Sequence, residues 1–176
     1  MFAKAKKALD KTLELLVTVS MGFLVVDVVW QVLTRYLLKN PSSWTEELAT
    51  FLMIWVGLLG ASVALNRGAH LGIDYLVVKL SRRKALCVSL FVFAVITAFS
   101  LLVMVIGGTQ LVHRTLVTNQ VSPAIGLKMG YVYLAIPISG LFLVIYSLEI
   151  FFDALTSLVK HKQTDGLHIF RSDTLD

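Results

Sequence analysis

Long segments without a charged side chain constrain this sequence more than any other feature. Three of them run over residues 48–65, 85–112 and 129–148, and a fourth apolar segment near the start has Asp27 as its only deep charge. Each is long enough to cross a bilayer, whose hydrocarbon core takes about 20 residues of helix. The sequence therefore predicts an all-α integral membrane protein with four transmembrane helices. We expect a single four-helix domain over residues 1–158, with spans at about 13–38, 44–66, 85–110 and 129–153, and a cytoplasmic tail over residues 159–176.

The composition supports this fold class. Of the 176 residues, 57% are hydrophobic and 15% are charged, a balance that a soluble domain of this size cannot bury in one core. The net charge of +5 comes from basic residues that adjoin the apolar segments, where positive charge sets orientation and attracts anionic lipid head groups. We therefore expect membrane lipids, and not nucleic acid, as partners.

The basic residues are divided unequally between the two sides of the predicted membrane. The N-terminal segment, the loop between spans two and three and the tail carry twelve Lys and Arg residues, at positions 4, 6, 7, 11, 67, 79, 82, 83, 84, 160, 162 and 171. The other two loops carry four, which are Arg35, Lys39, Arg114 and Lys128. Because cytoplasmic loops carry the excess of positive charge, both termini are predicted to lie inside.

Two segments have the pattern of amphipathic helices that lie on the membrane surface. Over residues 2–13, apolar side chains fall on one side of a helix and Lys4, Lys7 and Lys11 on the other. An ordinary charged flank of the first span is the alternative for this segment. Between spans two and three, apolar residues recur with helical spacing at positions 73, 76, 77 and 80, which predicts a short interfacial helix there.

Asp27, Gln31 and Arg35 are spaced four residues apart and form one polar stripe on the first span. Such a stripe is costly in lipid, so it faces protein or carries a function. Proton or ion coupling through Asp27 is one interpretation, but spans two and three have no acidic or histidine residue at their centres to serve as a relay. The interpretation we favour is that Asp27 and Gln31 hydrogen-bond to another helix, while Arg35 reaches the outer head groups.

The start of the second span has a helix-capping pattern. Ser43 and Glu46 have the S-x-x-E spacing in which each side chain satisfies a free backbone N–H of the first turn. Glu47 has no such local role, which makes it the better candidate for a contact with a partner. Trp44 suits the outer membrane interface.

Small residues and one proline indicate how the spans pack. Gly60 and Ala64 are one of several small pairs four residues apart that allow helix backbones to approach closely. In the fourth span, Pro137 removes a backbone donor and frees the carbonyl near Tyr133, which predicts a kink buried against protein.

Motifs of enzymes and cofactor sites are not found in the sequence. It contains no nucleophile elbow, phosphate-binding glycine loop, zinc-protease motif or cysteine pair, so we expect no enzymatic activity and no cofactor in this chain. His70 and Asp74 have a spacing that suits a metal on a helix, but two ligands without a third rarely form a site. The spans also show no internal repeat of the kind found in complete secondary transporters.

Several fragments together resemble a known family. They are QVLTRY at residues 31–36, PSSWTEEL at 41–48, WVGLLGA at 55–61, RGAHLGID at 67–74, SPAIG at 122–126 and GYVYLAIP at 130–137. In this order and spacing they resemble the small membrane subunit, or Q component, of tripartite ATP-independent periplasmic transporters. The resemblance covers about residues 5–155.

The resemblance implies a partner and a role. Such a subunit lies in the bacterial inner membrane and is bound to a large membrane subunit, which moves substrate by an elevator-type motion driven by a sodium gradient. A soluble periplasmic binding protein delivers the organic acid, of which C4-dicarboxylates and sialic acids are the expected classes. Sodium is then expected in the large subunit, and this chain would be the static scaffold.

The expected interface residues combine the bottom-up candidates with the family fragments. They are Asp27, Gln31, Arg35, Trp44, Glu46, Glu47, Trp55, Gly60, His70, Asp74, Ser122, Pro123 and Pro137. Two other functions stay open at this point. In one, the chain is a self-contained small oligomeric transporter or channel, in which Asp27 lines a pore, and in the other it is the membrane anchor of a different complex.

The topology is tested with reporter fusions. Fusions after Asn40 and Asn119 are expected to report a periplasmic location, and fusions after Ser81 and Lys160 a cytoplasmic one, because of the twelve-to-four division of basic residues. A periplasmic report from Lys160 would contradict the topology.

Overall fold

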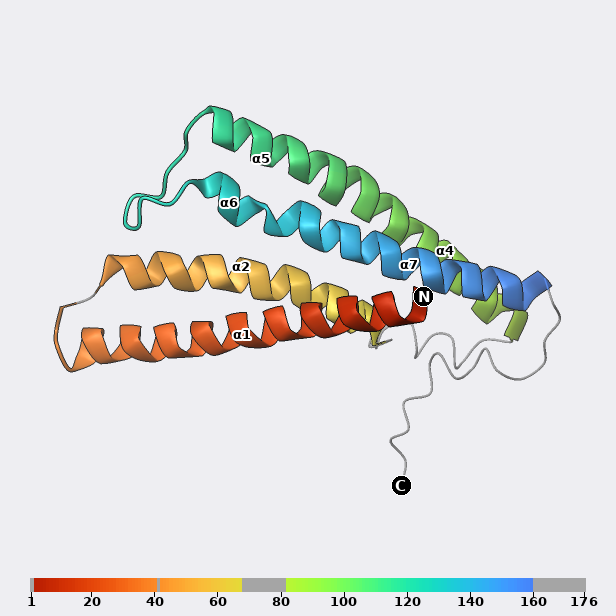
Figure 1. Ribbon diagram of the computed structural model, residues 1–176, viewed down its shortest axis with the longest axis horizontal. Coiled ribbons are helices and arrows are strands. Elements are labelled where there is room, and N and C mark those ends of the chain that lie inside the picture. Colours follow the sequence, from red (N-terminus) through yellow and green to blue (C-terminus); the bar gives the residue numbers. More distant parts are fainter. Residues whose placement is uncertain (1, 41, 68–81, 160–176) are drawn as a thin grey trace, which may run out of the picture.

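The computed structural model describes residues 2–40, 42–67 and 82–159, and these residues form helices joined by short turns (Figure 1). Four helical stretches are long and apolar enough to cross a membrane, which confirms the predicted all-α class with four spans. In chain order the elements are α1 (Phe2–Tyr36), α2 (Ser43–Asn66), α4 (Arg82–Phe99), the π-helix η1 (Ser100–Gly107), α5 (Gly108–Val117), α6 (Met129–Tyr133) and α7 (Ala135–Val159).

The helices alternate in direction along the long axis of the molecule (Figure 1). The turn after α1 and the loop at residues 118–128 lie at one end, which we call the outer end after the predicted topology. The N-terminus, the start of α4 and the end of α7 lie at the opposite, inner end. Alternation of this kind is what four consecutive crossings require, while the inside location of both termini stays a prediction.

The bundle is built around α2 and α7. α2 packs against α1 on one side and α7 on the other, and α7 also packs against α4 and η1. The buried core lies toward the inner end and consists of Leu13, Leu59, Leu65, Phe93 and Tyr146. α1 lies at the edge, and in its most apolar 18-residue window only 6% of the residues are buried. Its apolar surface therefore faces lipid or another protein.

The helices give bounds that can be set beside those of the predicted spans, whose positions in a membrane stay a prediction. The third helical stretch was expected to end near residue 110 but continues through α5 to Val117. Polar residues in this part of the helix are accommodated, because Thr109 and Thr115 donate their hydroxyls to carbonyls one turn earlier. A hydroxyl satisfied in this way no longer needs water.

The two predicted interfacial helices have different outcomes. α1 runs without a break from Phe2 to Tyr36, so the N-terminal amphipathic segment is the first part of the same helix that forms the first span. Its location on the membrane surface stays a prediction. The second predicted interfacial helix, around residues 73–80, lies outside the described residues.

The fourth span is interrupted near Pro137, where the missing backbone N–H predicts a kink. α6 ends at Tyr133, Leu134 separates it from α7, and Pro137 lies in the first turn of α7. The Leu134 carbonyl accepts the Ile138 N–H at 3.2 Å, while the Tyr133 carbonyl loses the donor that Pro137 lacks. The interruption is buried against the third span, since a Cβ built on Gly108 would lie 3.1 Å from Cδ of Pro137.

Close approach between helices of this chain occurs at glycines other than Gly60. A Cβ on Gly60 would meet no atom within 4 Å in the described part of the chain, so Gly60 lies on an open face of α2. On α7, by contrast, a Cβ on Gly140 would lie 2.6 Å from Cβ of Met104 in η1. Gly140 therefore allows the third and fourth spans to touch through their backbones.

We expect Gly140→Ala to destabilise the bundle by about 1–3 kcal/mol, the usual cost of forcing an extra group into a packed site. Met104 cannot move aside easily, because the clash is with its Cβ and not with the end of its side chain. Thermal unfolding of the purified protein in detergent measures the effect. Gly57→Ala is the matched control, since its added methyl meets nothing within 4 Å and favours the helix. Equal midpoints for Gly140→Ala and the parent would contradict this packing.

Candidate partner interface

At the outer end, a glutamate on α2 holds the loop that precedes the fourth span. The Glu47 carboxylate accepts the backbone N–H of Ala124 at 3.0 Å and of Ile125 at 3.1 Å. The loop closes on itself, because Ser122 accepts the Gly126 N–H at 3.0 Å and Gly126 has a φ of +71°, which glycine adopts without strain. Glu47 therefore has a role within the chain that the sequence did not indicate, and its contact with a partner stays a prediction.

The start of α2 differs from the predicted capping box. The N-cap is Ser42, one residue earlier than expected, and no side chain caps the first backbone N–H groups. Instead, the hydroxyls of Ser42 and Thr45 are 2.7 Å apart, and Thr45 donates to the Ser42 carbonyl at 2.8 Å. Thr45 is fully buried and takes the inward position, which leaves Glu46 exposed in the first turn. Glu46 therefore has no capping partner and remains a candidate for contact with a partner.

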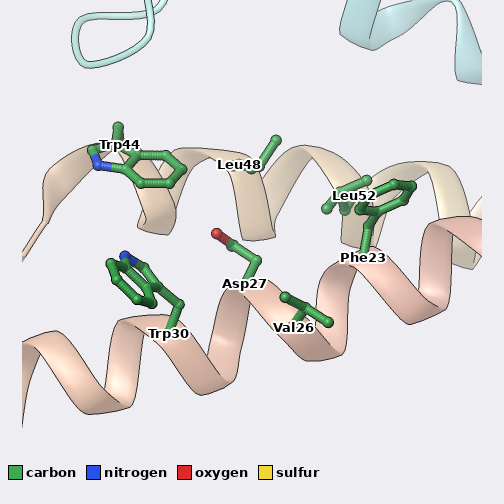
Figure 2. A pocket seen from close by; sticks show the side chains of 7 residues that line it. All are labelled: Phe23, Val26, Asp27, Trp30, Trp44, Leu48 and Leu52. Carbon is green, nitrogen blue, oxygen red and sulfur yellow. The ribbon is translucent and has the colours of Figure 1, made fainter.

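Asp27 lies in a groove between α1 and α2, as Figure 2 shows. The groove has a volume of about 420 Å³ and is otherwise lined by apolar and aromatic side chains, which are Phe23, Val26, Trp30, Trp44, Leu48 and Leu52. Asp27 points from α1 toward α2 and is only 7% exposed. Its Oδ2 is buried and has no hydrogen-bond partner among the described residues. The expected burial of Asp27 against another helix is thus observed, but the expected hydrogen bond of this oxygen is not.

The polar stripe continues from the groove to the outer end. Gln31 and Arg35 line a second hollow of about 270 Å³ together with Ser42, Ser43 and Glu46. Arg35 is exposed, and Gln31 is half-buried. The structure therefore brings the start of α2 next to the stripe, which the spacing of residues on the first span alone does not indicate.

The remaining expected interface residues lie in different parts of the structure. Trp55 packs against the buried core, and Ser122 is buried in the outer loop. Pro123 is exposed and lines a hollow with Glu46 and Glu47. Pro137 lies at the break in the fourth span. His70 and Asp74 lie outside the described residues.

A group of polar contacts at the inner end was not predicted. Lys6 on α1 pairs with Glu149 on α7, and Glu14 pairs with Arg67 after α2 at 2.8 Å. The Tyr146 hydroxyl donates to Asp10 at 2.6 Å. The sequence did hold a signal for the two ion pairs, since their residues fall near the cytoplasmic ends of the predicted spans and their charges are complementary.

Comparison with known proteins gives consistent matches. The family model described as tripartite ATP-independent periplasmic transporters, DctQ component, matches residues 9–157. The chain is 28% identical over 156 residues to the sialic acid TRAP transporter small permease protein SiaQ of Vibrio cholerae, covering 88% of this chain and 87% of that protein. It is 30% identical over 97 residues to the C4-dicarboxylate TRAP transporter small permease protein DctQ of Rhodobacter capsulatus, covering 55% of this chain and 42% of the relative.

A third match is to a protein that is much longer than this chain. A segment of this chain is 46% identical over 46 residues to the sialic acid TRAP transporter permease protein SiaT of Haemophilus influenzae. The match covers 26% of this chain but 8% of SiaT. The matched segment is therefore a small part of a much longer permease protein.

We expect Glu47→Ala to release the outer loop. The amides of Ala124 and Ile125 lose a charged acceptor, and a hydrogen bond to a charged group contributes about 1.5–3 kcal/mol. Their hydrogen exchange should become about tenfold faster or more, since about 1.4 kcal/mol corresponds to a factor of ten. Glu46→Ala, which removes the neighbouring carboxylate, should leave both amides as protected as in the parent. Unchanged exchange in Glu47→Ala would contradict the contact.

Proposed function

This chain belongs to the family of DctQ components of tripartite ATP-independent periplasmic (TRAP) transporters, and on that basis we propose that it is the small membrane subunit of such a transporter. The observation that carries the proposal is the family match over most of the chain, at residues 9–157, together with the four membrane-spanning helices. In this role the chain binds a large permease subunit in the bacterial inner membrane and holds it in place.

The apolar edge of the bundle supports a large membrane partner. α1 exposes bulky side chains along most of its length, among them Leu16, Phe23, Val26, Val29 and Trp30. Lipid covers such a surface, and so does another membrane protein.

A static scaffold is the role that fits the contacts within the bundle. Ser62 on α2 donates to the Ser139 carbonyl on α7 at 3.2 Å, and Thr97 on α4 donates to the Ser147 hydroxyl at 2.8 Å. The ion pairs at the inner end add further links between α1, α2 and α7. We propose that the bundle stays rigid while the large subunit carries out an elevator-type motion coupled to a sodium gradient.

The substrate proposed is an organic acid. One relative is named for sialic acid and another for C4-dicarboxylates, so both classes are candidates for the complete transporter. We further propose that the outer end, with Trp44, Glu46 and Pro123, faces the soluble binding protein that delivers this acid. All three side chains are exposed at the end of the bundle that the predicted topology directs toward the periplasm.

The proposal is tested by reconstitution. The chain is co-expressed with a large TRAP permease subunit of the same organism, the complex is purified through a tag on the large subunit, and uptake into proteoliposomes is measured with saturating binding protein. We expect the chain to co-purify and uptake of a sialic acid or a C4-dicarboxylate to require both subunits and an inward sodium gradient. Proteoliposomes that hold this chain alone should show no uptake.

Two results would overturn the proposal. The large subunit purified without this chain would retain full uptake, which would leave the chain without a role in transport. Alternatively, this chain alone would transport substrate, which would make it a self-contained carrier.

A further inference from the structure

The carboxylate of Asp27 is the feature of the groove that requires a partner. It is 7% exposed, and its Oδ2 has no donor among the described residues. A buried carboxylate oxygen without a donor is strongly unfavourable, and more so within a membrane, where water does not replace the missing donor. A donor from outside the described chain would remove this cost.

The walls of the groove favour a cation as that donor. Figure 2 shows the indole rings of Trp30 on α1 and Trp44 on α2 on the same side of Asp27, at the outer end of the groove. Indole faces attract ammonium and guanidinium groups, and desolvation strengthens this attraction. A carboxylate beside two tryptophans is thus complementary to a lysine or arginine side chain, whose methylene groups suit the apolar lining formed by Leu48 and Leu52.

The depth of Asp27 indicates where the cation comes from. Asp27 lies eight residues before Arg35, which at 1.5 Å per residue places it about 12 Å further into the membrane along α1. Half of the hydrocarbon core is about 15 Å thick, so Asp27 lies far below the level of lipid head groups. An amine on a lipid head group does not reach this depth, whereas a side chain on a neighbouring transmembrane helix does.

We infer that the groove between α1 and α2 receives a lysine or arginine side chain from a transmembrane helix of the large permease subunit, with Asp27 as its counter-ion. This inference rests on the proposed function, because it names the group of the large subunit that the scaffold recognises. The groove lies on α1, the edge helix, where the apolar surface is open to a partner.

The test compares variants of Asp27 in the complex with the large subunit. Asp27→Glu keeps the charge and is expected to retain the complex. Asp27→Asn and Asp27→Leu remove the charge and should lower the amount of small subunit that stays bound during a stringent detergent wash at least tenfold. Asp27→Leu separates recognition from folding, because it replaces an unpaired buried carboxylate by an apolar group that suits the groove.

Asp10→Asn is the matched control. It makes the same substitution on the same helix, but Asp10 accepts its hydrogen bond from Tyr146 within the chain. We expect it to leave retention of the large subunit within twofold of the parent value.

Charge exchange identifies the partner group. Asp27→Lys should abolish retention, and an acidic replacement of one lysine or arginine in the transmembrane segments of the large subunit should restore it. A photocrosslinking amino acid at position 26, which lines the same groove, should capture the segment that carries this residue.

Three results would overturn the inference. Asp27→Asn and Asp27→Leu retain the large subunit like the parent, no acidic replacement restores Asp27→Lys, or the crosslinker at position 26 captures lipid or a second copy of this chain. The proposed function fails in a different way, since the parent chain itself would then not co-purify with the large subunit.

Discussion

The hydrocarbon of a bilayer offers no hydrogen-bond donor or acceptor, and this constraint shapes the polar part of the bundle. Several polar side chains in the spans satisfy it within their own helix, as Thr97 does at the Phe93 carbonyl, and the same hydroxyl lies 2.8 Å from the Ser147 hydroxyl on α7. Ser62 satisfies it across helices by donating to the Ser139 carbonyl. These bonds fix α7 between α2 and α4. Asp27 Oδ2 in the groove and Ser100 Oγ in η1 are buried without a partner among the described residues, and for Asp27 we propose a donor from another chain.

The spans are read easily from the sequence because hydrocarbon thickness sets their length and excludes charge from them. Helix contacts are harder to read. Gly60 and Gly140 are both glycines in apolar helices, yet only Gly140 touches a neighbouring span, and that depends on how α7 is rotated against η1. The π-helical geometry of η1 was not predicted either, since the residues from Ser100 to Gly107 have the composition of any apolar span.

The candidate site likewise has some features that the sequence predicts and others that it does not. The stripe of Asp27, Gln31 and Arg35 follows from helical spacing within one element, so the sequence indicates it directly. The contact of Glu47 with the loop at Ala124 joins residues 77 positions apart, and no local pattern encodes it. The capping prediction at Ser43 missed by one residue, because Ser42 and Thr45 form an equally plausible pair and the burial of Thr45 decides between them.

The ion pairs at the inner end can form only in a fixed order while the chain is synthesised. Glu14 gains Arg67 once α2 has been made, but Lys6 joins Glu149, which is 143 positions further along the chain. At about 5–20 residues per second, the ribosome takes about 7–30 s to reach that partner. Within the described chain, α2 is the main element that the first helix can contact before α7 has been made. The ion pair between Lys6 and Glu149 therefore forms late in biogenesis, after the last span has been synthesised.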